Sequence, residues 1–274
     1  MYKIRILAVF FSVLLVVDQI DAQITEADRM LSTLNLIRRE KFDNILPGAM
    51  RDSKIDMWIQ VMGTKNGEEG NLDPLRLDLG SNTGTFVFTD RGGDRIERAV
   101  LGRASTTARN CGAYDIFGSE SDLREFVTER DPERIGVNFS ETIAVADGIS
   151  HTDYLKLVNL LGEKYAQRIV SAENLITAFR ERRVTSEIVF YGELCKETVL
   201  VMEEAIDLIE PGKTTVKDVS RWLVNQNMNS GYDSIFQFLL PGVFIQDSDG
   251  HENDARAGDD YVIQRGDLVH VDFG

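Results

Sequence analysis

The chain has 274 residues, of which 43% are hydrophobic and 27% are charged, and its formal net charge is −15. This composition excludes a disordered protein, and the length suffices for one large domain or two ordinary ones. The acidic excess argues against a nucleic-acid partner or an anionic membrane partner, because such surfaces are bound mainly through clustered lysine and arginine.

The first 22 residues have the pattern of a secretory signal peptide. Lys3 and Arg5 form a short basic segment, residues 6–17 are apolar apart from one serine, and Ala22 is a small residue at the expected cleavage site. The alternative is an uncleaved membrane anchor, although the apolar run is shorter than the roughly 20 residues that span a bilayer. Either alternative predicts export, to the periplasm or to the extracellular space.

Residues 23–183 are expected to form an α/β domain, because predicted strands and helices alternate along them. Apolar periodicity predicts the following elements, in this order: helix 26–41, helix 44–54, strand 55–62, strand 84–89, strand 95–101, helix 123–127, strand 134–139 and helix 154–161. The glycines at 92 and 93 favour a hairpin between the second and third strands. We place the end of this domain at the basic run 180–183.

The clearest helix is predicted at residues 186–209, and Pro211 and Gly212 end it. Its expected buried face consists of Ile188, Tyr191, Cys195, Val199, Met202, Ile206 and Ile209. Thr215 and Asp218 then form a capping box for the next helix. Two strands are predicted at 261–263 and 268–273, with a turn between them.

Cys111 and Cys195 are the two cysteines of the chain. Two widely separated cysteines make neither a disulfide framework nor a zinc cluster. Because Cys195 falls on the apolar face of the predicted helix, we expect its side chain to be packed. A single bridge between the two thiols is the alternative.

The predicted strand at 268–273 places a carboxylate on an open face. Successive side chains of a strand point to opposite sides, so Val269, Val271 and Phe273 share the side that must be buried. The opposite side carries Leu268, His270 and Asp272. A carboxylate is a hard oxygen donor that suits Mn(II), Zn(II) or Mg(II). On spacing alone, the alternative for Asp272 is a solvated side chain at a strand end.

The stretch Gly266–Gly274 (GDLVHVDFG) resembles the strand of the creatinase/Xaa-Pro aminopeptidase family that carries the first of five ligands to a dinuclear metal centre. Other segments agree with the family in their order: Ile45–Pro47, Ile55–Ile59, Asp73–Leu75, Phe88–Asp90, Ser186–Glu187, Pro211–Gly212 and Thr214 or Thr215. The resemblance covers residues 26–274, and its most specific part is the last 90 residues.

The resemblance implies an α/β fold with a smaller creatinase-type amino-terminal domain at 23–183, followed by the first part of a pita-bread catalytic domain at 184–274. It implies an exported Xaa-Pro aminopeptidase-like metallopeptidase that acts on peptides with proline at the second position and forms a homodimer. Two divalent ions, manganese or alternatively zinc or cobalt, would activate the attacking water. Asp272 would be the first ligand. The other four ligands would lie beyond Gly274, so we expect these 274 residues to be an incomplete fragment that is inactive alone.

The histidines supply further candidates for the site. By resemblance, His251 is a catalytic candidate that contacts the substrate, and a solvated loop histidine is the alternative. His270 would bind substrate or pack beside the metal ligand. The acidic loop at residues 247–260 lacks the ligand spacing of a calcium loop, so we expect it to be solvated.

Two alternative functions remain open. One is a creatinase-like hydrolase of the same fold that is not a peptidase. The other is a metal-free binding protein, or a protein whose amino-terminal domain acts in oligomerisation.

Overall fold

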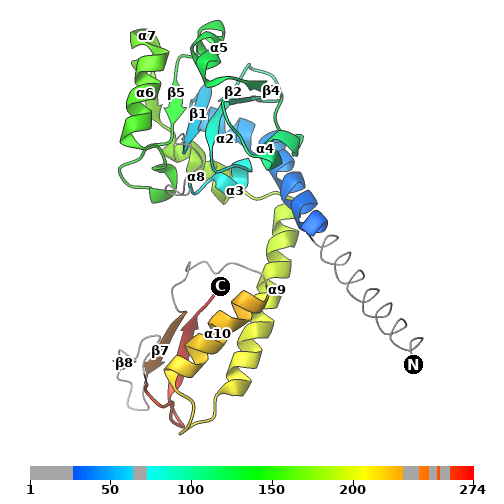
Figure 1. The fold of residues 1–274 in the computed structure, drawn as a ribbon, viewed down its shortest axis with the longest axis vertical. Helices are drawn as coiled ribbons and strands as arrows, with labels where there is room; N and C mark the ends of the chain where they lie inside the picture. Colours follow the sequence, from blue (N-terminus) through cyan, green and yellow to red (C-terminus); the bar gives the residue numbers. More distant parts are fainter. Residues whose placement is uncertain (1–26, 64–72, 231–240, 247–251, 254–259) are drawn as a thin grey trace, which may run out of the picture. The chain divides into compact units, whose positions relative to one another are not determined.

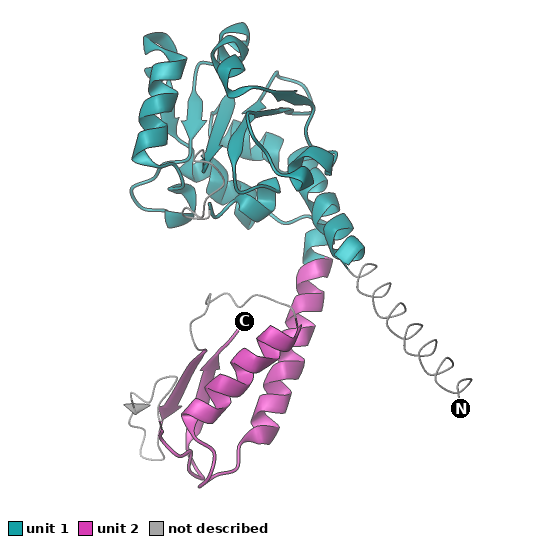
Figure 2. Cartoon of the chain, in the orientation of Figure 1, with its two compact units in different colours: residues 1–188 teal, residues 189–274 magenta. Residues whose placement is uncertain are grey.

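The computed structural model describes residues 27–63, 73–230, 241–246, 252–253 and 260–274. The chain forms two compact units that divide between residues 188 and 189 (Figure 2). The domain boundary expected at residue 183 stays a prediction. The proposed signal peptide lies outside the described residues. Within the described ranges, no helix combines the length and the apolar character needed to cross a membrane.

Unit 1 begins with a helix over residues 27–44. The helices and strands that follow are α2 (Leu46–Asp52), β1 (Met57–Met62), α3 (Arg76–Leu79), β2 (Gly84–Thr89), β3 (Glu97–Leu101), α4 (Thr106–Asn110), β4 (Ile116–Gly118), α5 (Leu123–Arg130), β5 (Ile135–Val137), α6 (His151–Leu161), α7 (Glu163–Ala166), β6 (Ile169–Ser171) and α8 (Glu173–Glu181). Every element predicted for this unit is present, with ends shifted by a few residues. The predicted α/β class is confirmed.

The strands of unit 1 form one mixed sheet in the order β4-β3-β2-β1-β5-β6 (Figure 1). The hairpin expected from the glycine turn is the antiparallel pair β2 and β3, and β1 also pairs antiparallel with β2. The remaining pairs, β3 with β4, β1 with β5 and β5 with β6, are parallel. Helices lie on both faces of the sheet.

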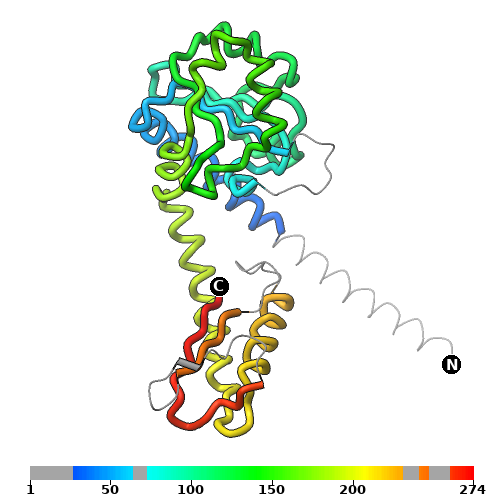
Figure 3. Tube along the Cα trace, turned by 90° about the vertical axis from the view of Figure 1, so that its left-hand side faces the viewer, coloured from blue at the N-terminus to red at the C-terminus, as the bar shows by residue number. Residues whose placement is uncertain are grey.

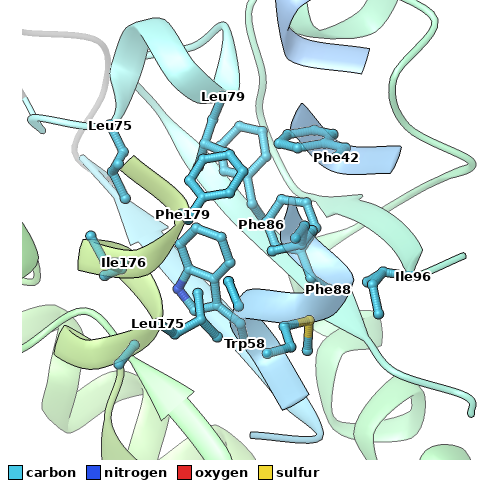
Figure 4. Close-up of a cluster of buried hydrophobic side chains, with 14 of the residues drawn as sticks. Phe42, Trp58, Leu75, Leu79, Phe86, Phe88, Ile96, Leu175, Ile176 and Phe179 are labelled. Atoms are coloured by element: carbon cyan, nitrogen blue, oxygen red, sulfur yellow. The ribbon is translucent and has the colours of Figure 1, made fainter. Parts of the chain in front are cut away.

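Alternation along the strands divides their side chains between two cores. Trp58, Phe86 and Phe88 join the core beneath α2 and α8, where the rings of Trp58 and Phe88 stack with centroids 4.8 Å apart (Figure 4). Ile59 and Val87 point to the other core, which is closed by α5, α6 and α7. Because both faces are covered, β1 and β2 are buried along their whole length.

A buried lysine fixes the start of α9 (Thr185–Leu208) in unit 1. The Nζ atom of Lys41 lies 3.4 Å from Oε1 of Glu187 and 3.8 Å from Oδ1 of Asp78. Arg183 also donates to Glu187 Oε1, at 2.5 Å. Removing one partner from such a buried group of charges leaves the others uncompensated, so the cluster strongly constrains the first turn of α9.

Unit 2 contains the rest of α9, α10 (Val216–Ser230), and an antiparallel sheet in the order β8-β7-β9. Its strands are β7 (Gly242–Gln246), β8 (Glu252–Asn253) and β9 (Leu268–Asp272). Its core consists of Ala205, Val216, Val219, Leu223, Val243, Ile245 and Ile263. Figure 3 shows β7 and β9 beside the two helices of this unit.

Helix α9 confirms the predicted element and only part of its predicted buried face, since Met202 and Ile209 pack against the core of unit 2. Val199 and Ile206 are 54% and 64% exposed, and Cys195 is an exposed free thiol. The helix is apolar on more than one side, and in unit 2 the side that contains Ala205 packs against the core. The predicted packing of Cys195 is therefore wrong. Cys111 is buried and also free, so the two thiols form no bridge.

The aromatic core of unit 1 yields a stability prediction. We expect Phe88→Ala to lower the free energy of unfolding by about 3–5 kcal/mol, because the substitution leaves a cavity beside Trp58. The matched control is Phe117→Ala, whose ring is partly exposed, with an expected change within about 0.5 kcal/mol. Guanidinium titrations followed by circular dichroism measure both. If both substitutions lowered the free energy of unfolding equally, the assignment of Phe88 to the buried core would be contradicted.

Asp73 is a buried carboxylate that is held by neutral groups. Its Oδ1 atom accepts a hydrogen bond from Leu75 N at 2.8 Å, and Oδ2 accepts bonds from Gln60 Nε2 at 2.9 Å and Asn138 Nδ2 at 3.4 Å. Among the described residues, no lysine or arginine forms an ion pair with it. Burial raises the pKa of Asp73, and the hydrogen bonds oppose this shift only in part.

This raised pKa predicts how stability depends on pH. The folded state holds the proton of Asp73 more tightly than the unfolded state, whose pKa is about 3.9. We therefore expect the free energy of unfolding of the wild type, relative to Asp73→Asn, to fall as the pH rises from that value through the raised folded pKa. Below the pKa of the unfolded state, the stabilisation that protonated Asp73 contributes is fully present. Urea titrations over this pH range measure the free energy of unfolding of both proteins. A wild type that becomes more stable relative to Asp73→Asn as the pH rises would contradict the raised pKa of Asp73.

Candidate metal centre

Strand β9 has one covered face and one open face. Val269 and Val271 pack against the core of unit 2, whereas Leu268, His270 and Asp272 are exposed. The predicted alternation is thus confirmed, and Asp272 lies at the end of the strand on the open face. Its role as a metal ligand stays a prediction.

The turn before β9 is fixed by a carboxylate that is separate from the open face. Asp267 Oδ2 accepts hydrogen bonds from Gln264 N at 2.7 Å and from the Tyr261 hydroxyl at 3.0 Å. Gly266 has a φ of 103°, a conformation that disfavours any residue with a Cβ. Asp267 therefore sets where β9 begins, and Asp272 is the carboxylate that β9 presents.

The segment before this turn is tied to the start of α10. Thr215 and Asp218 form the predicted capping interaction, since Asp218 N donates to Thr215 Oγ1 at 3.1 Å and Asp218 Oδ2 accepts from Thr215 N at 2.9 Å. Hydrogen bonds from the Thr215 side chain and backbone lower the pKa of Asp218. Instead of the predicted strand at 261–263, Val262 makes an isolated antiparallel bridge with Thr215. These bonds hold the approach to β9 against α10.

Strand β7 supplies the other half of the open face, which sequence reasoning missed. Gly242 pairs with Asp272, and Phe244 pairs with His270. A Cβ atom on Gly242 would lie 3.3 Å from the Cβ of Asp272 and 2.7 Å from Cε2 of Phe244. The Phe244 ring thus occupies the side-chain position that Gly242 leaves empty, next to Asp272. The alternating run GVFIQ at 242–246 was the available signal for this strand.

Asp272 fits the requirements for one metal ligand. Its side chain is exposed, and its carboxylate forms no hydrogen bond or ion pair with any described residue. In the part of the chain that the structure describes, no three ligand-type side chains come together as a metal site. That part therefore does not supply the complete ligand set of a dinuclear centre.

His270, the other site candidate that the structure describes, lies on this face. His251 and most of the acidic loop lie outside the described residues, and Asp260 forms a surface ion pair with Lys217 at 2.9 Å. His151 is exposed at the first position of α6 in unit 1. A cavity of about 320 Å³ in unit 1, lined by Thr85, Asp153 and Lys156 among others, contains none of the predicted site residues.

Comparison with known proteins yields matches among solved structures, whereas no family model and no curated protein matches the chain. A Xaa-Pro dipeptidase from Bacillus anthracis matches with a TM-score of 0.52 and 16% identity over 88% of this chain and 61% of that one. Zinc-substituted Escherichia coli aminopeptidase P in complex with product matches with a TM-score of 0.57 and 12% identity, over 86% and 59%. Proline aminopeptidase P II from Yersinia pestis matches with a TM-score of 0.55 and 12% identity, over the same shares.

At these identities the likeness establishes the fold. The predicted resemblance to the creatinase/Xaa-Pro aminopeptidase fold is confirmed, including its α/β class. The chain spans about three fifths of the length of these solved structures.

The two faces of the sheet in unit 2 can be tested with one pair of substitutions. Ile245 is 1% exposed and Leu268 is 61% exposed. We expect Ile245→Asp to unfold unit 2, because it buries an unpaired charge, and Leu268→Asp to change stability by less than about 0.5 kcal/mol. Trp222 packs against this core, whereas Trp58 contributes the signal of unit 1. The change in tryptophan fluorescence relative to the wild type during thermal unfolding therefore reports on unit 2. If Leu268→Asp were the damaging variant, the assignment of faces would be reversed.

Proposed function

We propose that this chain is part of an exported metallopeptidase of the Xaa-Pro aminopeptidase type, which releases an N-terminal residue that precedes proline. One observation carries the proposal. Asp272 is a carboxylate without a partner among the described residues, at the end of a strand on an open sheet face, in a fold shared with a Xaa-Pro dipeptidase and with aminopeptidases P.

Asp272 would hold one of two divalent ions, and the four further ligands that the family resemblance implies would come from outside the described residues. When bound, such a pair of ions lowers the pKa of a shared water and polarises the carbonyl that the water attacks. A carboxylate oxygen suits Mn(II), and Zn(II) or Co(II) are the alternatives. The contribution of the chain itself is to hold Asp272 rigidly, through the turn at Asp267 and the pairing of β9 with β7.

The remaining parts of the proposal concern partners and location. The substrate is a peptide with proline at its second position, and His251 contacts it as a catalytic residue. The protein forms a homodimer. The basic and apolar pattern of residues 1–22 directs it out of the cytoplasm.

The peptidase proposal is tested on the protein as its own gene expresses it. We expect cleavage of an X-Pro peptide that a chelator abolishes and Mn(II), Zn(II) or Co(II) restores, with little cleavage of the matching X-Ala peptide. Asp272→Asn should lower the rate by more than about a hundredfold, since even residues that only support metal ligands contribute roughly ten- to a hundredfold.

Asp260→Asn is the matched control, because Asp260 is exposed and lies outside the proposed site. Its rate should equal that of the wild type. Absence of chelator-sensitive cleavage would refute the peptidase function and leave a hydrolase of another specificity or a binding protein. Full activity in Asp272→Asn would refute the metal role of that carboxylate.

A further inference from the structure

We propose that His270 is a second metal ligand, which binds through an imidazole nitrogen to the same ion as Asp272. The two residues would form a chelate on the open face of β9. This inference rests on the metal site of the proposed function and extends it, because it adds a nitrogen donor from the described residues to the ion that Asp272 would bind.

The strand geometry brings the two side chains within reach of one ion. Residues two apart on a strand project from the same face, with Cα atoms about 6.6–6.8 Å apart. Both side chains of β9 are exposed on that face. Ligand bonds of about 2.0–2.2 Å to nitrogen and oxygen place an ion above position 271, between the two donors.

Strand β7 lies beside His270 and Asp272 and contributes the residues that pair with them. Phe244 lies directly opposite His270, with ring centroids 5.8 Å apart and planes inclined by 42°. The phenyl ring lies beside the imidazole. Opposite Asp272, Gly242 has no side chain, and a Cβ atom there would lie 2.7 Å from Cε2 of Phe244 and 3.3 Å from the Cβ of Asp272. The Phe244 ring therefore extends over Gly242 and forms an apolar border along both donors.

Both donors are available for coordination. Within the described ranges, neither imidazole nitrogen of His270 forms a hydrogen bond, and the Asp272 carboxylate has no hydrogen bond or ion pair. An ion therefore displaces only solvent from these two groups, and no bond between described residues has to break.

The added nitrogen determines which metals benefit. Imidazole suits zinc and the later transition metals, whereas carboxylate and water suit manganese and magnesium. His270 should therefore strengthen binding of Zn(II) much more than binding of Mn(II). A site with Asp272 and oxygen donors alone lacks this bias.

Metal titrations of the purified, metal-free chain test the inference without any measurement of activity. Isothermal titration with Zn(II) and with Mn(II) compares the wild type with His270→Ala and Asp272→Asn. We expect His270→Ala to weaken Zn(II) binding by at least about tenfold and Mn(II) binding by less than about threefold, in line with the donor preferences of the two metals. Asp272→Asn should weaken both.

The control is His151→Ala, which removes the other described histidine, an exposed residue of unit 1. Its Zn(II) affinity should equal that of the wild type. Because His270 is exposed, circular dichroism should show the same fold in His270→Ala. The visible spectrum of bound Co(II) supplies a second readout, since loss of a nitrogen ligand should shift its absorption bands.

The outcomes separate this inference from the function on which it rests. If His270→Ala binds Zn(II) and Co(II) as the wild type does while Asp272→Asn binds them weakly, His270 is not a ligand and the Asp272 site stands. If neither substitution changes binding, both the histidine ligand and the Asp272 site are refuted. If His151→Ala weakens binding as much as His270→Ala, the effect is not specific to this face and the inference fails.

Discussion

The opposite projection of successive strand side chains is the constraint on which both units depend. In unit 1, β1 and β2 each contribute side chains to two cores, so neither strand has a solvent-exposed face and both are buried throughout. In unit 2 helices cover one face only, so β9 alternates between packed valines and exposed side chains. A shift of one residue in either sheet would exchange the two faces completely. The position of Asp272 therefore follows from the packing of Val269 and Val271.

The same constraint explains what could be predicted from the sequence. Runs of apolar residues and strict alternation are local patterns, so β1, β2, β3, β5 and the open face of β9 follow from sequence alone. The three-residue strands β4 and β6 were not predicted. The cap at Thr215 is equally local, because both of its hydrogen bonds join residues three apart. Sequence patterns were therefore sufficient to predict an element wherever the contacts that determine it join residues close in sequence.

Prediction failed where a neighbour distant in sequence decides the outcome. Helix α9 is apolar on several sides, and only its packing in unit 2 selects the side of Ala205, which no periodicity could reveal. Gly242 and Phe244 are identified as residues of the open face only from their pairing with β9, which lies more than twenty residues further along the chain. His251 lies outside the described residues, so its predicted role stays a prediction.

The two thiols of the chain differ sharply in access to solvent. Cys111 is 1% exposed beneath the sheet of unit 1, whereas Cys195 is exposed on α9, and the sequence contains no other cysteine. A maleimide dye or a nitroxide should therefore attach to the folded protein at one position, without any engineered residue. A label at Cys195 would lie on the helix that begins in unit 1 and continues through unit 2, where its mobility or emission reports on this connecting element in solution.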